Sequence, residues 1–219
     1  TAAIDDMDIY LEVVDQAHVM RKLVIDGSNT SGFQRSILLG QDGAIETADG
    51  PVSIEDLMLE EESAKRVEET ADGVVYSLDR LGVPLVEIGT GPDIRSPEQA
   101  REAAERIGML LRSTGAVKRG LGTIRQDVNV SIAEGARVEV KGVQDLEGIE
   151  AIVRGEVSRQ AELLAIREEL RERDAEVGTP REVSAVFEGT DSGVVRSALD
   201  AGGTVTAVPL FGFDGLVGR

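Results

Sequence analysis

One acidic residue, Glu87, lies within an otherwise apolar stretch of the sequence, residues 83–90. Successive side chains of a strand point to opposite faces, and here both faces are otherwise apolar, which is typical of a strand covered on both sides. A buried carboxylate is costly unless it is paired, hydrogen-bonded or bound to a metal. The stretch therefore predicts a buried strand and a functional role for Glu87, with a structural acid as the alternative.

Three consecutive carboxylates, Glu60, Glu61 and Glu62, directly follow a predicted strand at 54–59. Carboxylate oxygens are the ligands that a hard cation such as Mg²⁺ prefers, so a metal site is one interpretation. The alternative is a solvated acidic patch, because the chain is acidic throughout.

A predicted hairpin at 124–141 carries the remaining candidates on one of its faces. Apolar residues alternate with Arg125, Asp127 and Asn129 before a turn at 133–135, and with Glu139 and Lys141 after it. In the register of a three-residue loop, Asp127 faces Lys141 and Asn129 faces Glu139. Arg125 and Lys141 suit phosphate oxygens. The alternative is a set of ordinary cross-strand pairs on an exposed face.

The elements that must position these residues begin with two strands in 4–26, where Met7, Ile9, Leu11 and Val13 alternate. A glycine-containing turn at 26–32 follows, then a strand at 36–39 that is turned back at 41–43. A helix begins after Ser96, because Pro97 suits the first helical position and Gln99 completes a capping box. Its expected end is Gly115.

The second half of the chain reads as one long helix or two over 145–173, followed by a boundary at 178–180. Beyond it we expect a strand, a short helix near 192–200 and a strand at 204–210. That final piece is too short for an independent core.

The composition is strongly acidic, with 41 acidic and 23 basic residues and a formal net charge of -18. Such a surface repels itself in dilute buffer, and salt screens the repulsion, so the composition suggests a halophilic organism. It also argues against non-specific nucleic-acid binding. Cysteine is absent, and no secretory signal or membrane-spanning apolar run is present, so we expect a soluble, cytoplasmic protein without disulfides.

Several long runs of the sequence resemble the tRNA-dependent amidotransferase B/E family. The runs at 82–88 (GVPLVEI) and 92–97 (PDIRSP) resemble motifs of the whole family. The runs at 26–35 (DGSNTSGFQR), 123–131 (TIRQDVNVS) and 138–144 (VEVKGVQ) resemble motifs of its archaeal E branch. The resemblance covers nearly all 219 residues. It also implies an internal fragment, which lacks the family's N-terminal strands and C-terminal helical and tail regions.

The resemblance implies an α+β fold. Residues 1–178 would form a mixed or antiparallel sheet with packed helices, the cradle domain that is likened to glutamine synthetase. Residues 179–219 would begin an insertion domain of the type found in aspartyl-tRNA synthetases.

The activity that the resemblance implies is an ATP-driven amidation that requires Mg²⁺. The side-chain carboxylate of glutamate on tRNA(Gln) is phosphorylated, and ammonia from a partner D subunit displaces the phosphate. The expected metal ligands are Glu61 and Glu87, the expected catalytic residues are Asp127, Glu60 and Lys141, and the expected cofactor-binding residues are Arg125, Asn129 and Glu139.

The family's histidine ligand belongs to an N-terminal segment outside this sequence, and His18 does not match it, so we expect an incomplete metal site. Local arginines or another domain would have to hold the tRNA against the acidic surface. Two other functions stay open: a scaffold that presents tRNA without catalysis, and a ligase that acts on a small carboxylate without tRNA.

Overall fold

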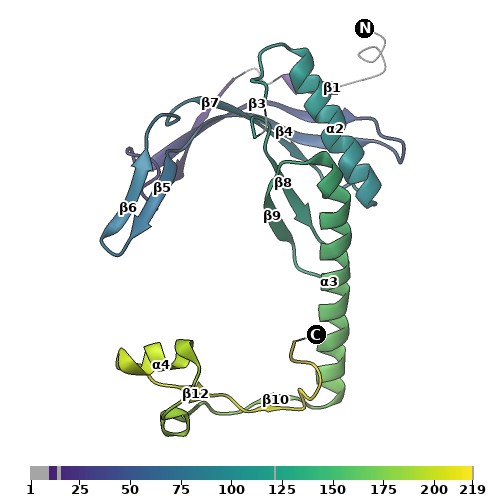
Figure 1. Ribbon diagram of the computed structural model, residues 1–219. Helices are drawn as coiled ribbons and strands as arrows, with labels where there is room; N and C mark the ends of the chain where they lie inside the picture. Colours follow the sequence, from purple (N-terminus) through teal and green to yellow (C-terminus); the bar gives the residue numbers. More distant parts are fainter. Residues whose placement is uncertain (1–9, 14–15, 121, 219) are drawn as a thin grey trace. The chain divides into compact units, whose positions relative to one another are not determined.

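The computed structural model describes residues 10–13, 16–120 and 122–218 and has an α+β fold (Figure 1). It contains three α-helices in these residues, and its five-stranded sheet and strand pairs are antiparallel where their registers are defined. The chain divides into two compact units, one comprising residues up to 129 with 139–154, the other 130–138 with 155 onward. The predicted boundary at 178–180 stays a prediction.

The first unit is built on a five-stranded sheet in which the strand order is β1-β3-β4-β7 and β2 also pairs with β3. The strands are β1 (Tyr10–Val13), β2 (Val19–Leu23), β3 (Phe33–Ile45), β4 (Val52–Glu61) and β7 (Pro84–Thr90). Both strands predicted in 4–26 are therefore present, although Met7 and Ile9 lie outside the described residues. Among the described residues, β4 is the only strand that pairs with β7, so β7 lies at the edge of this sheet.

The turn predicted at 41–43 is wrong, because β3 continues through these residues to Ile45. Asp42 takes a positive φ of 55°, and the ladder with β4 shifts register between Leu38 and Gly40. These irregularities bend the strand without reversing it. The reversal comes later, where Thr47 and Gly50 exchange backbone hydrogen bonds of 3.2 and 3.0 Å.

Helix α2 (Pro97–Ser113) begins and ends where the sequence predicts. The Ser96 hydroxyl accepts a hydrogen bond of 3.1 Å from the Gln99 backbone N–H. The Gln99 side chain accepts one of 2.8 Å from the N–H of Arg95 rather than Ser96. The helix packs on the sheet through a small apolar core formed by Ile45, Val52, Ile54 and Ala103, with Ile88, Ile94 and Ile107 against it.

Two hairpins complete the strands of this region. The hairpin of β5 (Lys65–Thr70) and β6 (Gly73–Ser77) was not predicted, and it extends beyond the five-stranded sheet (Figure 1). The predicted hairpin at 124–141 is confirmed as β8 (Gln126–Val130) and β9 (Val138–Val143).

The second half of the chain contains one continuous helix, α3 (Leu146–Glu172), rather than two. Its first part belongs to the first unit and is held to α2 by the ion pairs Arg101–Glu150 (2.7 Å) and Arg154–Glu98 (2.8 Å). None of the helices in the described residues is long and apolar enough to cross a membrane.

In the second unit, the buried Gln160 of α3 donates a hydrogen bond of 3.1 Å to the Val130 carbonyl. The predicted short helix is α4 (Gly193–Asp200), capped by Ser192. The single strand predicted at 204–210 is instead two short strands, because the chain pairs with two separate partners. The remaining elements are β10 (Glu176–Val177) paired with β13 (Leu210–Phe211), β11 (Arg181–Glu182) paired with β12 (Thr206–Ala207), and a 3₁₀ turn, η1 (Ser184–Phe187).

Candidate active site

The register of β3, β4 and β7 decides which glutamates can meet. Ser36 of β3 lies opposite Glu60 of β4, and Met58 of β4 lies opposite Glu87 of β7. Residues two apart on a strand share a face, so Ser36, Glu60 and Glu87 lie on one face, here named the carboxylate face. Glu61 is the next residue of β4 and lies on the opposite face, here named the ion-pair face.

Glu60 is buried on the carboxylate face and is oriented by two neutral donors from β3. The Ser36 hydroxyl donates a hydrogen bond of 2.9 Å to Oε1, and the Gln34 amide donates one of 3.5 Å to Oε2. Neutral donors fix the direction of a carboxylate while leaving its charge without a cationic partner. Glu60 is thus a pre-oriented acid on this face.

Glu87 lies beside Glu60, and its pKa is raised above the usual 4.5. Partial removal from water is the largest cause, followed by the hydrogen bond and the charge repulsion that come from Glu60. The Asp56 carboxylate raises the pKa of Glu87 further, while the Lys22 ammonium lowers it. Two carboxyl groups this close favour sharing a proton, or a cation, over both being charged.

The prediction that Glu87 lies in a strand buried on both faces is wrong. Most residues of β7 are exposed or half-buried, and Glu87 as a whole residue is exposed. The physical reason is that β7 is the edge strand, so its apolar side chains are covered only in part. The Glu87 carboxylate is nevertheless partly removed from water beside Glu60, and this raises its pKa.

Glu61 occupies the ion-pair face together with Arg35 of β3. The Arg35 backbone N–H donates to Glu61 Oε2 at 3.1 Å, and the guanidinium Nε donates to Oε1 at 2.8 Å. These bonds hold the pKa of the Glu61 carboxyl below its usual value. The structure therefore does not bring Glu61 and Glu87 together, and the expected convergence of these two carboxylates is wrong because the register separates them by the thickness of the sheet.

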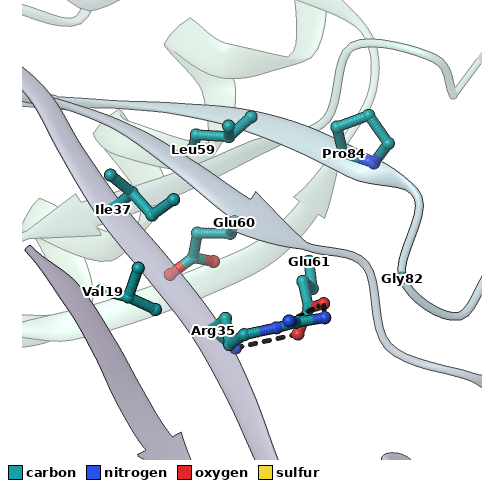
Figure 2. Close-up of a pocket in the computed structure, with 8 residues that line it drawn as sticks. All are labelled: Val19, Arg35, Ile37, Leu59, Glu60, Glu61, Gly82 and Pro84. Atoms are coloured by element: carbon teal, nitrogen blue, oxygen red, sulfur yellow. Dashed lines mark hydrogen bonds and ion pairs between the residues drawn. The ribbon is translucent and has the colours of Figure 1, made fainter. Parts of the chain in front are cut away.

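An open cavity of about 210 Å³ includes the Arg35–Glu61 pair in its lining (Figure 2). Its lining residues are Val19, Arg35, Ile37, Leu59, Glu60, Glu61, Gly82 and Pro84. The cavity is smaller than the roughly 300–1,000 Å³ of small-molecule sites. We assign no ligand to it.

Glu62 bridges two arginines at the end of β4. It forms ion pairs with Arg125, which precedes β8, and with Arg80 at 3.9 Å. Arg125, predicted to bind the cofactor, is therefore held beside the strand that carries Glu60. Its side chain stays partly exposed, so it can still reach an anionic oxygen.

The polar face of the β8–β9 hairpin has the predicted pairing between Asp127 and Lys141, at 3.5 Å. Lys141 also pairs with Glu139 at 3.1 Å, and these two carboxylates raise the pKa of the ammonium group. Asn129 is exposed on the same face. Within the described residues, no hydrogen bond or ion pair joins this group to Glu60 or Glu87.

The ligands on the carboxylate face fit Mg²⁺ in kind, because both are carboxylates. Mg²⁺ is usually held by one or two carboxylates, with waters and substrate phosphates completing its shell. The Glu60–Glu87 pair supplies two carboxylates, and burial together with the neighbouring Glu60 raises the pKa of Glu87, an effect that a bound cation would oppose. No group of three or more acidic, histidine or cysteine side chains is placed to hold a metal in the part of the chain that is described.

Sequence reasoning missed the residues that orient these glutamates. Gln34 and Ser36 orient Glu60, and Arg35 fixes Glu61. A usable signal was present, because polar residues at 34 and 36 alternate within an otherwise strand-like run. It could not be read without the register that places these residues opposite β4.

Comparison with known proteins gives a match to the GatB/GatE catalytic domain over residues 5–195. The chain belongs to this family. The E subunit of glutamyl-tRNA(Gln) amidotransferase from Halobacterium salinarum is 73% identical over 209 residues, which is 95% of the chain. The proteins of the same name from Haloarcula marismortui and Methanocaldococcus jannaschii are 70% and 59% identical over 209 and 211 residues.

The chain spans about a third of the length of these relatives, 34% in each case. Its resemblance to the B/E amidotransferases is thus confirmed as membership of the GatB/GatE family. The roles of the individual site residues remain predictions.

Proposed function

We propose that this chain is the catalytic part of a protein that converts glutamate on tRNA(Gln) into glutamine, using ATP and ammonia. The observation that carries the proposal is the identity of 59–73% with amidotransferase E subunits across 95% of the chain. The arrangement of Glu60 and Glu87 supports it, because phosphoryl transfer needs charge compensation at a defined place.

In this reaction the side-chain carboxylate of the tRNA-bound glutamate attacks the γ-phosphorus of ATP and ADP leaves. Ammonia then displaces phosphate from the acyl phosphate to give the amide. We infer that Glu60 and Glu87 would hold Mg²⁺, which would supply positive charge to compensate the phosphate oxygens. Ser36 and Gln34 keep the Glu60 carboxylate oriented. Glu61, which the resemblance implied as a ligand, has a structural role through Arg35 in this proposal.

The hairpin supplies the second part of the proposed site. In this proposal Arg125, which pairs with Glu62, contacts phosphate oxygens, and Asn129 and Glu139 of the β8–β9 hairpin contact the nucleotide. Lys141 forms an ion pair with Asp127, and the pKa of the Lys141 ammonium group is raised, so this group keeps its proton. Lys141 therefore acts as a fixed positive charge rather than as a base.

The partners in this proposal are an ammonia-supplying D subunit and tRNA(Gln) carrying glutamate, in the cytoplasm. Residues 1–178 would be the cradle domain, and 179–219 would begin the insertion domain. The short strands and the small helix α4 of that final segment are compatible with part of a larger domain, because its apolar Val186, Val194 and Phe211 are exposed.

The test is ATP hydrolysis by the full-length protein with its partner subunit, measured with Glu-tRNA(Gln), with uncharged tRNA and with free glutamate. Hydrolysis and amide formation that require Glu-tRNA(Gln) would support the proposal. Binding of tRNA without hydrolysis would identify a presenting scaffold, and turnover with free glutamate alone would identify a tRNA-independent ligase. Either result would overturn the proposed function.

A further inference from the structure

The longest stretch of this acidic chain without Asp or Glu is the 21-residue segment 106–126, which contains five basic residues. Two of them form ion pairs with glutamates, Arg106 with Glu102 and Arg125 with Glu62. The other three are Arg112, Lys118 and Arg119, here named the free cations. They lie at the end of α2 and in the connection that follows it.

The free cations are exposed, and none forms an ion pair or side-chain hydrogen bond within the described part of the chain. This contrasts with arginines such as Arg35, Arg101 and Arg154, each of which is held by a glutamate. In a chain of net charge -18, three cations without an ion pair, within a segment that has no Asp or Glu, locally oppose the repulsion that the rest of the surface exerts on an anion.

Backbone N–H groups beside Lys118 and Arg119 also lack hydrogen-bond partners among the described residues. No acceptor among the described residues faces the backbone N–H groups of Lys118, Arg119 and Gly120. Gly120 and Gly122 have φ values of 124° and 77°, a conformation that glycine adopts without strain. Unpaired N–H groups on a glycine-rich turn, beside free cations, are a common arrangement for binding phosphate oxygens.

We propose that this connection, through Arg112, Lys118 and Arg119, binds the phosphate backbone of the substrate RNA. The inference rests on the proposed function, which makes an RNA the substrate. Nucleotide phosphates offer the same oxygens, but the free cations lie on an open surface and spread over a helix end and a loop. Successive phosphates of an RNA backbone can each contact one of these separated cations, whereas a single triphosphate is too compact to contact all three.

The test uses the full-length protein and a fluorescently labelled, uncharged tRNA(Gln) transcript, with the Kd measured over a series of KCl concentrations. The variant Lys118→Gln with Arg119→Gln removes two free cations. We expect about tenfold weaker binding at the lowest salt and a slope of log Kd against log [KCl] that is smaller by about two. The single variant Arg112→Gln should change both quantities in the same direction by about half as much on a logarithmic scale.

The matched control is Lys65→Gln with Arg181→Gln, which makes the same charge change at two exposed cations without ion pairs in the described residues. It should leave the Kd for tRNA close to the wild-type value, and melting temperatures should show both double variants folded. Equal Kd values for the two double variants would overturn the inference. So would weaker binding of Mg²⁺-ATP, measured without RNA, with unchanged binding of tRNA, because the cations would then serve the nucleotide. If wild-type protein bound no tRNA at all, both the proposed function and this inference would fail. That result differs from the other two, in which wild-type protein binds tRNA and the inference alone fails.

Discussion

The two faces of the β3–β4–β7 sheet use adjacent glutamates in opposite ways. On the carboxylate face, Glu60 is oriented by neutral donors and stands beside Glu87, whose pKa is raised. On the ion-pair face, Arg35 holds Glu61 and the pKa of that carboxyl is lowered. Glu60 and Glu61 are adjacent on β4, yet Glu60 lies beside another carboxylate whereas Glu61 forms an ion pair with Arg35. Neither the residue type nor the position in the motif distinguishes the two.

The largest effect that we expect is a loss of enzymatic activity on substitution of a glutamate of the carboxylate face. In the full-length enzyme, Glu87→Gln or Glu60→Gln should lower tRNA-dependent ATP hydrolysis and amidation by about 10²–10³, because an electrostatic contact to the transferring phosphate is lost. Glu87→Gln should also melt at or above the wild-type temperature, since it relieves repulsion by Glu60. A Glu87→Gln enzyme that unfolds readily, yet is fully active when folded, would make Glu87 a structural acid.

The matched control for this comparison is Glu61→Gln, which makes the same chemical change one residue away on the opposite face. Because Glu61 is bound to Arg35, we expect a small loss of stability and activity within a few-fold of wild type. Loss of activity in Glu61→Gln equal to that in Glu87→Gln would break the distinction between the faces.

Salt should raise the stability of the whole protein and, to a smaller extent, should reduce the stability difference between wild type and Glu87→Gln. With a net charge of -18, the melting temperature should rise between low and molar KCl, as screening reduces repulsion. The rise should be smaller in Glu87→Gln, where part of the repulsion has already been removed. A melting temperature that is flat or falling in wild-type protein would contradict the interpretation of the acidic surface as a salt adaptation.

The pH dependence of stability should have opposite signs for the two faces. The raised pKa of Glu87 means that its contribution favours the fold at low pH and is lost as pH rises from 4.5 through the folded pKa. The lowered pKa of Glu61 means that its contribution is present above 4.5 and is lost as pH falls through the folded pKa.

Melting curves against pH measure both contributions. The melting temperature of Glu87→Gln should rise above that of wild type as pH increases from 4.5 through the folded pKa of Glu87. The melting temperature of Glu61→Gln should be lower than that of wild type at and above pH 4.5, by less than about 4 °C, and the difference should vanish as pH falls through the folded pKa of Glu61. Slopes of the same sign in the two variants would show that both carboxylates share one environment.

The elements that the sequence predicts well are those with local signals. Ser96, Pro97 and Gln99 mark the start of α2 through contacts within four residues, and Gly115 marks its end. The β8–β9 hairpin follows from alternation over adjacent strands, and the predicted Asp127–Lys141 pair is present although the connection, residues 131–137, is longer than the three residues predicted. These predictions need no knowledge of distant parts of the chain.

The elements predicted wrongly depend on partners far away in sequence. The turn expected at 41–43 looks like a turn locally, but pairing with β4 carries β3 through it. Glu87 appears buried in an apolar run because sequence does not show that β7 lies at the sheet edge. The pairing of Glu60, rather than Glu61, with Glu87 depends on the β4–β7 register, which has no local signature.

The most direct test of the account is a carboxyl NMR titration of the chain labelled with ¹³C-glutamate, with and without excess Mg²⁺, using Glu87→Gln and Glu61→Gln to assign the signals. We predict that Glu87 titrates above 4.5 without Mg²⁺ and that Mg²⁺ lowers its apparent pKa, because a cation stabilises the charged form. Glu61 should titrate below 4.5 and should not respond to Mg²⁺. An ordinary pKa for Glu87 that Mg²⁺ leaves unchanged, or a response at Glu61 instead, would contradict the assignment of the metal site to the carboxylate face.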